Sequence, residues 1–494
     1  MMKKVNAMIF TLMMLTVPLA GCTGDDEPAE VLGCKNTQAN NYNENVTKDD
    51  GSCDYDLDDD GVKDIYEVDG CTDDTANNLD LGATDDDGSC DYDLDDDGVL
   101  DADEILGCMD SAASNYNENA TDDDGSCTDR TAVAITTGYY HTCAILDDGS
   151  VSCWGNNGDG QLGDGTTTNR NTSAQTSSLG ADRTAVAITG GEYHTCAILD
   201  DGSVSCWGDN EYRQLGDGTT DDRLTPTQTS SLGTDRTAVA ITAGAYHTCA
   251  ILDDGSVSCW GSNWNGELGD GTTTQRNTPT QTSSLGADRT AVAITAGDFH
   301  TCAILDDGSV SCWGANEYGR LGDGTTTLRN TPTQTSSLGA DRTAVAITAG
   351  DSHTCAILDD GSVSCWGFNN GGRLGDGTGT NRNTPTQTSS LGTDRTAVAI
   401  NAGIYQTCAI LDDGSVSCWG YNSDGQLGDG TNTLRNTPTQ TSSLGTDRTA
   451  VAISAGGYHT CAILDDGYVS CWGGNGTGQL GDGTRIDRNT PTAI

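Results

Sequence analysis

Two short stretches of the sequence place acidic residues at a spacing that can hold a metal ion. They run from residue 56 to 67 and from 93 to 104, with acids at loop positions 1, 3, 5, 9 and 12 and Gly at position 6. Alternate carboxylates on a tightly curled loop converge on one ion, and the carbonyl at position 7 adds a ligand. The pattern predicts two calcium sites. Their predicted ligands are Asp56, Asp58, Asp60, Val62, Asp64 and Glu67 in the first loop and Asp93, Asp95, Asp97, Val99, Asp101 and Glu104 in the second.

These loops resemble thrombospondin type-3 and dockerin-like calcium loops more than the paired loops of EF-hand sensors. The apolar residue stands at position 7, and a Gly-Cys pair follows each final Glu within four residues, which leaves no room for a flanking helix. The resemblance implies a structural calcium site that stiffens a stalk. A solvated acidic linker without a bound ion is the alternative.

Cysteine residues frame these loops in units that repeat every 37 residues. In each unit a Gly-Cys is followed, 19 residues after its Cys, by the Cys of an Asp-Asp-Gly-Ser-Cys sequence. An even number of Cys per unit in an exported chain predicts one disulfide per unit. Because the units have few apolar residues, we expect each to depend on that bond. The predicted pairs are Cys34–Cys53, Cys71–Cys90 and Cys108–Cys127.

The first 22 residues are typical of an export signal. Two Lys precede an apolar run of 14 residues at 7–20, which is too short to span a hydrocarbon core of ~30 Å. The following Leu-Ala-Gly-Cys, ending at Cys22, resembles the lipobox of prokaryotic lipoproteins. That resemblance implies a signal peptide at 1–21, lipidation of Cys22, and a tether at 22–33 that anchors an exported protein to the cell membrane or cell surface. An ordinary cleaved signal with a chance Cys is the alternative.

A unit of 53 residues recurs seven times in residues 128–494. Each copy contains Thr-Cys-Ala-Ile-Leu-Asp-Asp-Gly and, ten residues after that Cys, a second Cys followed by Trp-Gly. In the first copy Asp147, Asp148 and Gly149 suit a three-residue hairpin turn, so Cys143 faces Cys153 at a separation that a disulfide needs. We therefore predict seven cross-strand disulfides. They join Cys143–Cys153, Cys196–Cys206, Cys249–Cys259, Cys302–Cys312, Cys355–Cys365, Cys408–Cys418 and Cys461–Cys471.

Two further strands complete each unit. One is the Ala-Val-Ala-Ile stretch, as at 237–242, and the other surrounds Thr-Pro-Thr-Gln-Thr, as at 225–229, where a Pro at the strand start fits an outer position. Four strands in each of seven units predict an all-β seven-bladed β-propeller at 128–494, preceded by a disulfide-bonded, calcium-binding stalk at 34–127. If the ring closes, we expect one blade to combine strands from both ends of the propeller.

The repeated sequence Gly-x-x-His-Thr-Cys-Ala-Ile-Leu, continued by Trp-Gly and Gln-Leu-Gly as at 138–165, strongly resembles the regulator-of-chromosome-condensation repeat. The resemblance covers about 367 residues. Members of that family include an exchange factor for a nuclear small GTPase and a secreted bacterial inhibitor of β-lactamases. It implies a rigid disc that binds another protein through loops on its faces. The exchange role is not expected here, because this chain is exported and lacks a basic tail.

The repeated polar residues favour a structural role over catalysis. All six His occupy one repeat position, which is Gln406 in the remaining copy, and an Asp in Leu-Gly-Asp-Gly and an Arg six residues later recur in every copy. Catalysis needs one asymmetric cluster, whereas these groups repeat around the ring. The resemblance implies that each His bonds the backbone within its own blade, and the Asp are expected to be turn residues. We find no nucleophile elbow or phosphate loop, and expect no enzyme activity.

Differences between the copies indicate where a partner would bind. Variation is concentrated between Trp-Gly and Leu-Gly, where aromatic residues and Arg accumulate, as they do in interface hot spots. Neutral drift of exposed loops is the alternative. A second variable position lies two residues before the His. The candidate partner-binding residues are Tyr212, Arg213, Trp264, Tyr318, Arg320, Phe368, Arg373 and Tyr421.

Net charge restricts the partner further. The chain has a formal charge of -51, so the phosphates of a nucleic acid would be repelled. We expect a monomeric surface lipoprotein that binds a protein or glycan through its propeller, with calcium as the only cofactor. An envelope enzyme with its chemistry in the propeller channel and an inhibitor of a secreted enzyme are the alternatives.

Overall fold

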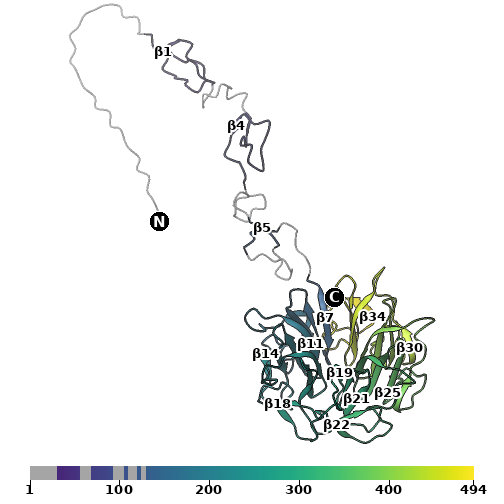
Figure 1. Cartoon of the computed structure of the whole chain (residues 1–494). Coiled ribbons are helices and arrows are strands. Elements are labelled where there is room, and N and C mark those ends of the chain that lie inside the picture. The colour runs from purple at the N-terminus through teal and green to yellow at the C-terminus, as the bar shows by residue number, and fades with distance from the viewer. Residues whose placement is uncertain (1–29, 56–67, 93–104, 109–118, 124–129) are drawn as a thin grey trace, which may run out of the picture. The chain divides into compact units, whose positions relative to one another are not determined.

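The computed structural model describes residues 30–55, 68–92, 105–108, 119–123 and 130–494 (Figure 1). The predicted lipidation site Cys22 and both predicted calcium loops, 56–67 and 93–104, lie outside these residues. Every regular element in the described part of the chain is a β-strand. No helix within that part is long and apolar enough to span a membrane.

The Cys-bounded units each contain one pair of two-residue parallel strands. These pairs are β1 (Leu32–Gly33) with β2 (Lys48–Asp49), β3 (Asp69–Gly70) with β4 (Asp85–Asp86), and β5 (Leu106–Gly107) with β6 (Asp122–Asp123). The predicted disulfides Cys34–Cys53 and Cys71–Cys90 are confirmed. Cys108 is also disulfide-bonded, and its predicted partner Cys127 lies outside the described residues. In the first unit the buried apolar residues are only Cys34, Ala39 and Val46, a core too small to stand without its disulfide.

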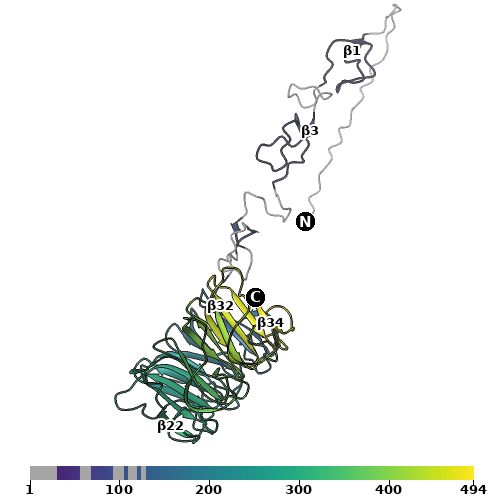
Figure 2. The same ribbon diagram turned by 90° about the vertical axis from the view of Figure 1, so that its right-hand side faces the viewer.

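The remaining strands form seven four-stranded antiparallel sheets, the blades of one propeller. Figure 1 shows the labelled strands following one another around a ring, and Figure 2 shows that ring turned by 90°. In every blade the strand order in space is the order along the chain, from the innermost strand to the outermost. The seven-bladed propeller predicted from the repeats is confirmed.

The blades are numbered along the chain, and their strands have the following bounds. Blade 1 is β7 (Ala132–Thr137), β8 (His141–Leu146), β9 (Val151–Gly155) and β10 (Arg170–Gln175); blade 2 is β11 (Ala185–Gly190), β12 (His194–Leu199), β13 (Val204–Gly208) and β14 (Arg223–Gln228); blade 3 is β15 (Ala238–Ala243), β16 (His247–Leu252), β17 (Val257–Gly261) and β18 (Arg276–Gln281); blade 4 is β19 (Ala291–Ala296), β20 (His300–Leu305), β21 (Val310–Gly314) and β22 (Arg329–Gln334). Blade 5 is β23 (Ala344–Ala349), β24 (His353–Leu358), β25 (Val363–Gly367) and β26 (Arg382–Gln387); blade 6 is β27 (Ala397–Ala402), β28 (Gln406–Leu411), β29 (Val416–Gly420) and β30 (Arg435–Gln440); blade 7 is β31 (Ala450–Ala455), β32 (His459–Leu464), β33 (Val469–Gly473) and β34 (Arg488–Ala493).

The central hairpin of each blade has the register that the sequence predicts. In blade 2 Cys196 is paired with Cys206, and the turn between them places Gly202 at φ +77°, a left-handed conformation that suits Gly. All seven predicted cross-strand disulfides are present. The outermost strand differs from the prediction, because Pro226 lies inside β14 rather than at its start. It falls where the register with β13 shifts, so the missing N–H interrupts no regular ladder.

The hydrophobic core is divided into seven similar parts, one between each pair of adjacent blades. Between blades 2 and 3, the disulfide Cys196–Cys206, Ile198 and Val204 pack against Leu252 and Trp260 of the next blade. The seven repeated Trp are all buried, with at most 2% of the side chain exposed. Each blade is therefore held mainly by its two neighbours.

Ring closure differs from the expectation drawn from the sequence. No blade combines strands from both ends, since β7–β10 form blade 1 and β31–β34 form blade 7. The expectation of a shared blade was wrong because each 53-residue unit already starts with its innermost strand and ends with its outermost. Blades 7 and 1 meet through hydrogen bonds of the kind that link other neighbours. For example, Trp154 of blade 1 donates a hydrogen bond to the backbone carbonyl of Gln479 in blade 7.

Candidate functional site

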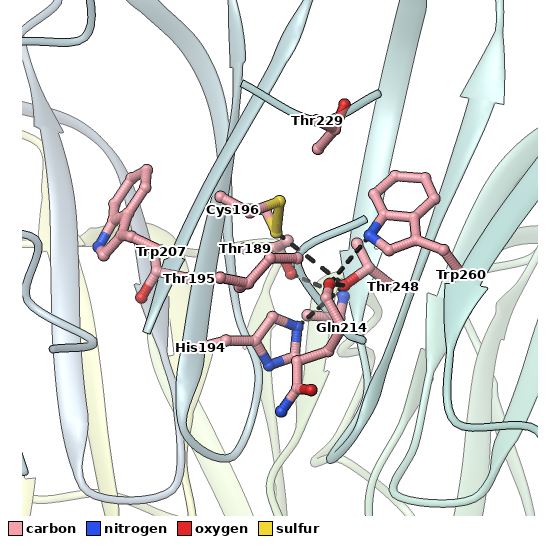
Figure 3. The surroundings of a disulfide bond; sticks show 12 residues. Thr189, His194, Thr195, Cys196, Trp207, Gln214, Thr229, Thr248 and Trp260 are labelled. Atoms are coloured by element: carbon pink, nitrogen blue, oxygen red, sulfur yellow. Dashed lines mark hydrogen bonds between the residues drawn. A yellow bond between two sulfur atoms is a disulfide. The ribbon is translucent and has the colours of Figure 1, made fainter. Parts of the chain in front are cut away.

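The repeated His and Thr side chains form a belt that links each blade to the next. In Figure 3 the Thr248 hydroxyl donates a hydrogen bond to the backbone carbonyl of Gln214 at 2.9 Å, and Trp260 donates to the same carbonyl at 2.9 Å. The Thr248 hydroxyl also lies 2.9 Å from Nε2 of His194 in the preceding blade. Because its proton is given to Gln214, Thr248 accepts from His194, which fixes the proton of that His on Nε2. The expectation that each His bonds the backbone of its own blade was wrong, because the His bonds a Thr of the next blade.

Burial keeps these His neutral. It lowers the pKa of His194 to about 3 and that of His141 to about 4. In blade 6 Gln406 replaces the His and donates to the backbone carbonyls of Gly456 and His459. An amide that substitutes for the ring shows that this position needs a hydrogen-bond donor and no proton transfer. The belt is structural.

The repeated Asp and Arg hold the loops that follow each Trp-Gly. In blade 2 the Asp217 carboxylate accepts hydrogen bonds from the amide and hydroxyl of Thr219 and pairs with Arg223 at 2.6 Å. Burial by itself raises the pKa of Asp217, but the hydrogen bonds from Thr219 and Arg223 outweigh it, so the pKa is lowered. The same arrangement recurs in each blade. These residues brace the scaffold and leave the unrepeated positions free for recognition.

One end of the central channel is lined by side chains that differ from blade to blade. The channel holds a cavity of about 140 Å³. The positions two residues before each His contribute Tyr139, Glu192, Ala245, Asp298, Asp351, Ile404 and Gly457 to its lining. This second variable position of the sequence is therefore gathered into one ring. Its acids lie on blades 2, 4 and 5, so the channel mouth is asymmetric.

The acidic side of the mouth contains a cluster that sequence reasoning missed. Burial raises the pKa of Asp298 well above its usual range, the nearby Asp351 and Glu192 raise it further, and Arg320 opposes them. Arg320 is 1% exposed and donates to the backbone carbonyl of Asp351 at 3.3 Å. Its repeat position holds Gln or Glu in five other blades and Arg373 in blade 5. The presence of Arg at this position in only two adjacent repeats was the feature of the sequence that could have indicated this cluster.

A second ring, immediately before each His, is mostly aromatic. It consists of Tyr140, Tyr193, Tyr246, Phe299, Ser352, Tyr405 and Tyr458. Tyr140 stacks on Tyr458 with ring centroids 5.7 Å apart, and Tyr405 contacts Tyr458 at 5.4 Å. Because six of the seven blades share this feature, a comparison of repeats treats it as part of the scaffold. The structure shows it instead at the mouth, beside the variable loops.

The predicted partner-binding aromatics lie against this second ring or against one another. Tyr212 contacts Tyr246 at 4.8 Å and Trp264 at 5.1 Å between ring centroids. Tyr421 contacts Tyr405 at 5.8 Å, and Tyr318 contacts Phe368 at 4.6 Å. Trp264 is the most exposed of them, with 55% of its side chain accessible. We call the surface formed by Tyr212, Trp264, Tyr318, Phe368, Tyr421 and the ring before the His the aromatic face.

The predicted Arg residues have a different place from the aromatics. Arg373 is 5% exposed, with its cation 4.8 Å from the ring centroid of Phe368, and Arg320 lies beneath Tyr318 at 5.4 Å. Arg213 is half-buried and hydrogen-bonds Gln275 of the next blade. In this structure the three Arg position the loops, and their guanidinium groups are not presented to solvent as free contacts.

Beside the channel, loops of blades 1, 2 and 3 line an acidic pocket. Its volume is about 690 Å³. Its walls are four carboxylates, three phenol rings and one hydroxyl. They belong to Asp159, Tyr193, Asp209, Glu211, Tyr212, Thr220, Asp222 and Tyr246.

Comparison with known proteins agrees with this architecture. Residues 283–494 match the model of the RCC1-like domain, and residues 148–198, 201–251 and 254–304 match the regulator of chromosome condensation (RCC1) repeat. The ultraviolet-B receptor UVR8 of Arabidopsis thaliana is 33% identical over 366 residues, which cover 74% of this chain and 82% of UVR8. The chain belongs to the RCC1 repeat family. The resemblance expected from the sequence is thereby confirmed for the propeller.

Other RCC1-type proteins extend the comparison. The human E3 ubiquitin-protein ligase HERC2 is 31% identical over 345 residues, which cover 69% of this chain but only 7% of HERC2. Among solved structures, human WBSCR16 has a TM-score of 0.62 and 20% identity, covering 70% of this chain and 93% of that one. Prp20p of Saccharomyces cerevisiae has a TM-score of 0.59 and 21% identity, covering 66% and 80%. These two likenesses show the RCC1 propeller fold.

Proposed function

We propose that the propeller is a protein-binding module and that its aromatic face contacts the partner. The observation that carries the proposal is the gathering of unrepeated side chains at one end of the channel, with Trp264 and Tyr421 exposed there. Large amphipathic rings on a rigid frame supply contact area at a small entropic cost. Related propellers support a protein partner, since the structure of Prp20p was described with its binding to Gsp1p and histones. Inhibition of a secreted enzyme would be one form of such binding.

The test compares partner capture by two variants of the displayed protein. The first changes Tyr212, Trp264, Tyr318, Phe368 and Tyr421 to Ser, and we expect it to lose the partner that proximity labelling enriches with the wild type. The matched control changes Val186, Val239, Val292, Val345 and Val398 to Ser. These Val are 59–61% exposed and lie near the first residue of the inner strands, at the end away from the aromatic face. Identical neighbours for all three proteins would refute the role of the aromatic face.

For the N-terminal part we propose a lipid anchor at Cys22 followed by a calcium-stiffened stalk, so that the propeller is displayed at the cell surface. The lipobox-like sequence and the two acidic loops support this proposal.

For the propeller, a glycan is the alternative partner, because exposed aromatic rings also stack on sugars.

Calcium removal tests the stalk. Chelation should expose residues 54–104 to limited proteolysis while sparing 128–494, because the loop carboxylates repel one another once the ion has gone. The fragments are identified by mass spectrometry, with the propeller in the same tube as the internal control. Equal survival of both segments with and without chelator would contradict the calcium sites.

One observation favours a second candidate, an enzyme of the cell envelope. The cluster of Glu192, Asp298 and Asp351 at the channel mouth is unique in the ring, and the pKa of Asp298 is raised by burial and by the other two acids. A buried carboxyl whose pKa is raised by neighbouring acids is an arrangement used for general acid catalysis. A hydrolytic activity on envelope substrates that is abolished by Asp298→Asn would support this candidate.

A further inference from the structure

The acidic pocket lined by blades 1, 2 and 3 has a composition suited to one class of ligand. Two of its carboxylates, Asp159 and Asp209, are half-buried, and none of its four acids forms a salt bridge with any residue that the structure describes. Burial raises the pKa of Asp209 and of Asp159, and the charge of Asp222 raises both further. Negative charge is thus concentrated where water is partly excluded and no protein cation offsets it.

Aromatic rings form the rest of the wall. Tyr212 meets Tyr246 edge to face at 4.8 Å, and it also meets the exposed Trp264 edge to face at 5.1 Å. Tyr193 also lines the pocket. A cation placed among these rings would gain from their electron-rich faces as well as from the carboxylates. A neutral sugar would gain only the stacking, and would leave the four carboxylates uncompensated.

The propeller itself does not require the charges of this pocket. Asp209 accepts hydrogen bonds from the Glu211 amide and the Gln214 side chain, both at 2.9 Å. In blade 1 the uncharged Asn156 makes the corresponding bonds to Gly158 and Gln161. The same repeat position holds Ser262, Ala315, Phe368, Tyr421 and Gly474 in the other blades.

At Asp222, too, the loop needs a hydrogen-bond acceptor but not a charged one. Its carboxylate accepts a hydrogen bond from the Asn210 amide at 2.9 Å. In blade 1 Asn169 accepts the equivalent bond from Asn157 at 2.9 Å, without a charge. Both acids therefore carry a negative charge that the loop does not use.

We propose that this pocket receives a Lys or Arg side chain from a basic segment of a protein partner. Charge complementarity selects this occupant, because four carboxylates without a salt bridge and three phenol rings line a space of about 690 Å³. Within the described residues no group of three or more acids, His or Cys is arranged to hold a metal ion. The inference rests on the proposed protein-binding function and adds the chemistry of the partner to it.

The test uses the full-length protein and a matched pair of probe peptides. One is an acetylated and amidated pentapeptide with Arg at its centre among Gly, and the other has citrulline, an uncharged isostere, in place of Arg. Binding is measured by calorimetry and by the fluorescence of Trp264, whose ring adjoins the pocket wall. We expect the Arg peptide to bind in the millimolar range or tighter and the citrulline peptide to bind at least tenfold more weakly.

Two double variants isolate the role of the charges. Asp209→Asn with Asp222→Asn should weaken binding of the Arg peptide at least tenfold while leaving thermal stability unchanged, since Asn156 and Asn169 show that amides make the same bonds. Asp424→Asn with Asp487→Asn is the control. Asp424 occupies the repeat position of Asp159, and Asp487 accepts the same capping bond as Asp222, but both lie outside the pocket. This control should bind like the wild type.

Three results would overturn the inference. They are equal affinity for the Arg and citrulline peptides, undiminished binding by the Asp209→Asn, Asp222→Asn variant, and binding of a neutral oligosaccharide in competition with the Arg peptide. Failure of the inference is separable from failure of the proposed function. If partner capture on cells survives the pocket variant but is lost in the aromatic variant, the face binds a protein and the pocket is not its receptor for a cation.

Discussion

A single threonine hydroxyl connects three elements of this propeller. Thr248 on β16 donates to the carbonyl of Gln214 in the loop of blade 2 and accepts from His194 on β12. These groups are fully buried, so each hydrogen bond that is lost would leave an unsatisfied polar atom at a cost of about 1–3 kcal/mol. Because the Thr and the His recur around the ring, the repeat preserves a joint between blades. A joint of this kind constrains which residues can vary, and directs variation to the loops beyond it.

The first prediction concerns the acid sensitivity of these joints. Burial lowers the pKa of His247 to about 3, so the folded protein binds fewer protons than the unfolded chain between that value and 6.5. Stability present above pH 6.5 is therefore lost as the pH falls, by about 1.4 kcal/mol per pH unit for each His. The variant His247→Gln copies Gln406 of blade 6 and has no imidazole to protonate at this position. Between pH 7 and 5.5 its free energy of unfolding should therefore fall by about 1.4 kcal/mol less than that of the wild type.

Urea unfolding at the two pH values measures this difference. Carboxylates whose pKa is raised by burial, such as Glu192 and Asp298, are present in both proteins, so their contributions cancel in the comparison. An equal loss of stability in the variant and the wild type would show that His247 is not buried in its neutral form.

At the scale of elements, the sequence determines the hairpins but not what joins them. Pairing of Cys249 with Cys259 follows from the position of the turn alone, and the structure has that pairing. The residue bonded by His247 could not be predicted in this way, because Thr301 belongs to another blade, 54 residues further along the chain. The burial of Arg320 under the aromatic face could not be predicted from the sequence either, because it depends on how two loops pack. Local geometry is encoded within a repeat, whereas contacts between repeats need the whole ring.

The second prediction follows from the different burial of the two kinds of disulfide. The 14 propeller Cys are fully buried, whereas Cys53 and Cys90 of the Cys-bounded units are half-buried. A buried disulfide is reduced only when its blade opens, so mild reductant followed by alkylation should label the N-terminal units first.

Removing one propeller disulfide, by Cys249→Ala with Cys259→Ala, should lower the free energy of unfolding by about 2–3 kcal/mol, because the bond closes a short loop.

Peptide mapping by mass spectrometry reads the order of labelling, and denaturant unfolding reads the cost of the double variant. Simultaneous labelling of both groups of Cys in the folded protein would show that the blades open as readily as the N-terminal units.

On the scale of the whole molecule, the ring has one junction unlike the other six. Successive blades are joined by a linker whose Leu packs against the core between them, as Leu391 does between blades 5 and 6. Blades 7 and 1 are not consecutive, and there Ile494 takes the place of that Leu. A cavity of about 560 Å³ lies at this junction, lined by residues that include Trp154, Val469 and Ile494. At this junction His459 still donates a hydrogen bond to the Thr142 hydroxyl at 2.8 Å, but no linker joins the two blades.

The last prediction is that the propeller opens first between blades 7 and 1. Each blade contacts mainly its neighbours, so the free energy of opening is lowest at the one interface that has no linker and that borders a cavity. Native-state hydrogen exchange should therefore give lower protection to the inner and central strands of blades 1 and 7 than to those of blade 4. Ile494→Ala should increase exchange in blades 1 and 7 further, by about tenfold, since it enlarges the existing cavity. The control for Ile494→Ala is Leu391→Ala, at a junction that has a linker.

Leu391→Ala removes a comparable side chain from the core between blades 5 and 6, but the linker still joins these two blades. Its effect on exchange should therefore stay within blades 5 and 6. Uniform protection around the ring, or equal effects of the two substitutions on blades 1 and 7, would mean that side-chain contacts alone close this ring as firmly as a linker does.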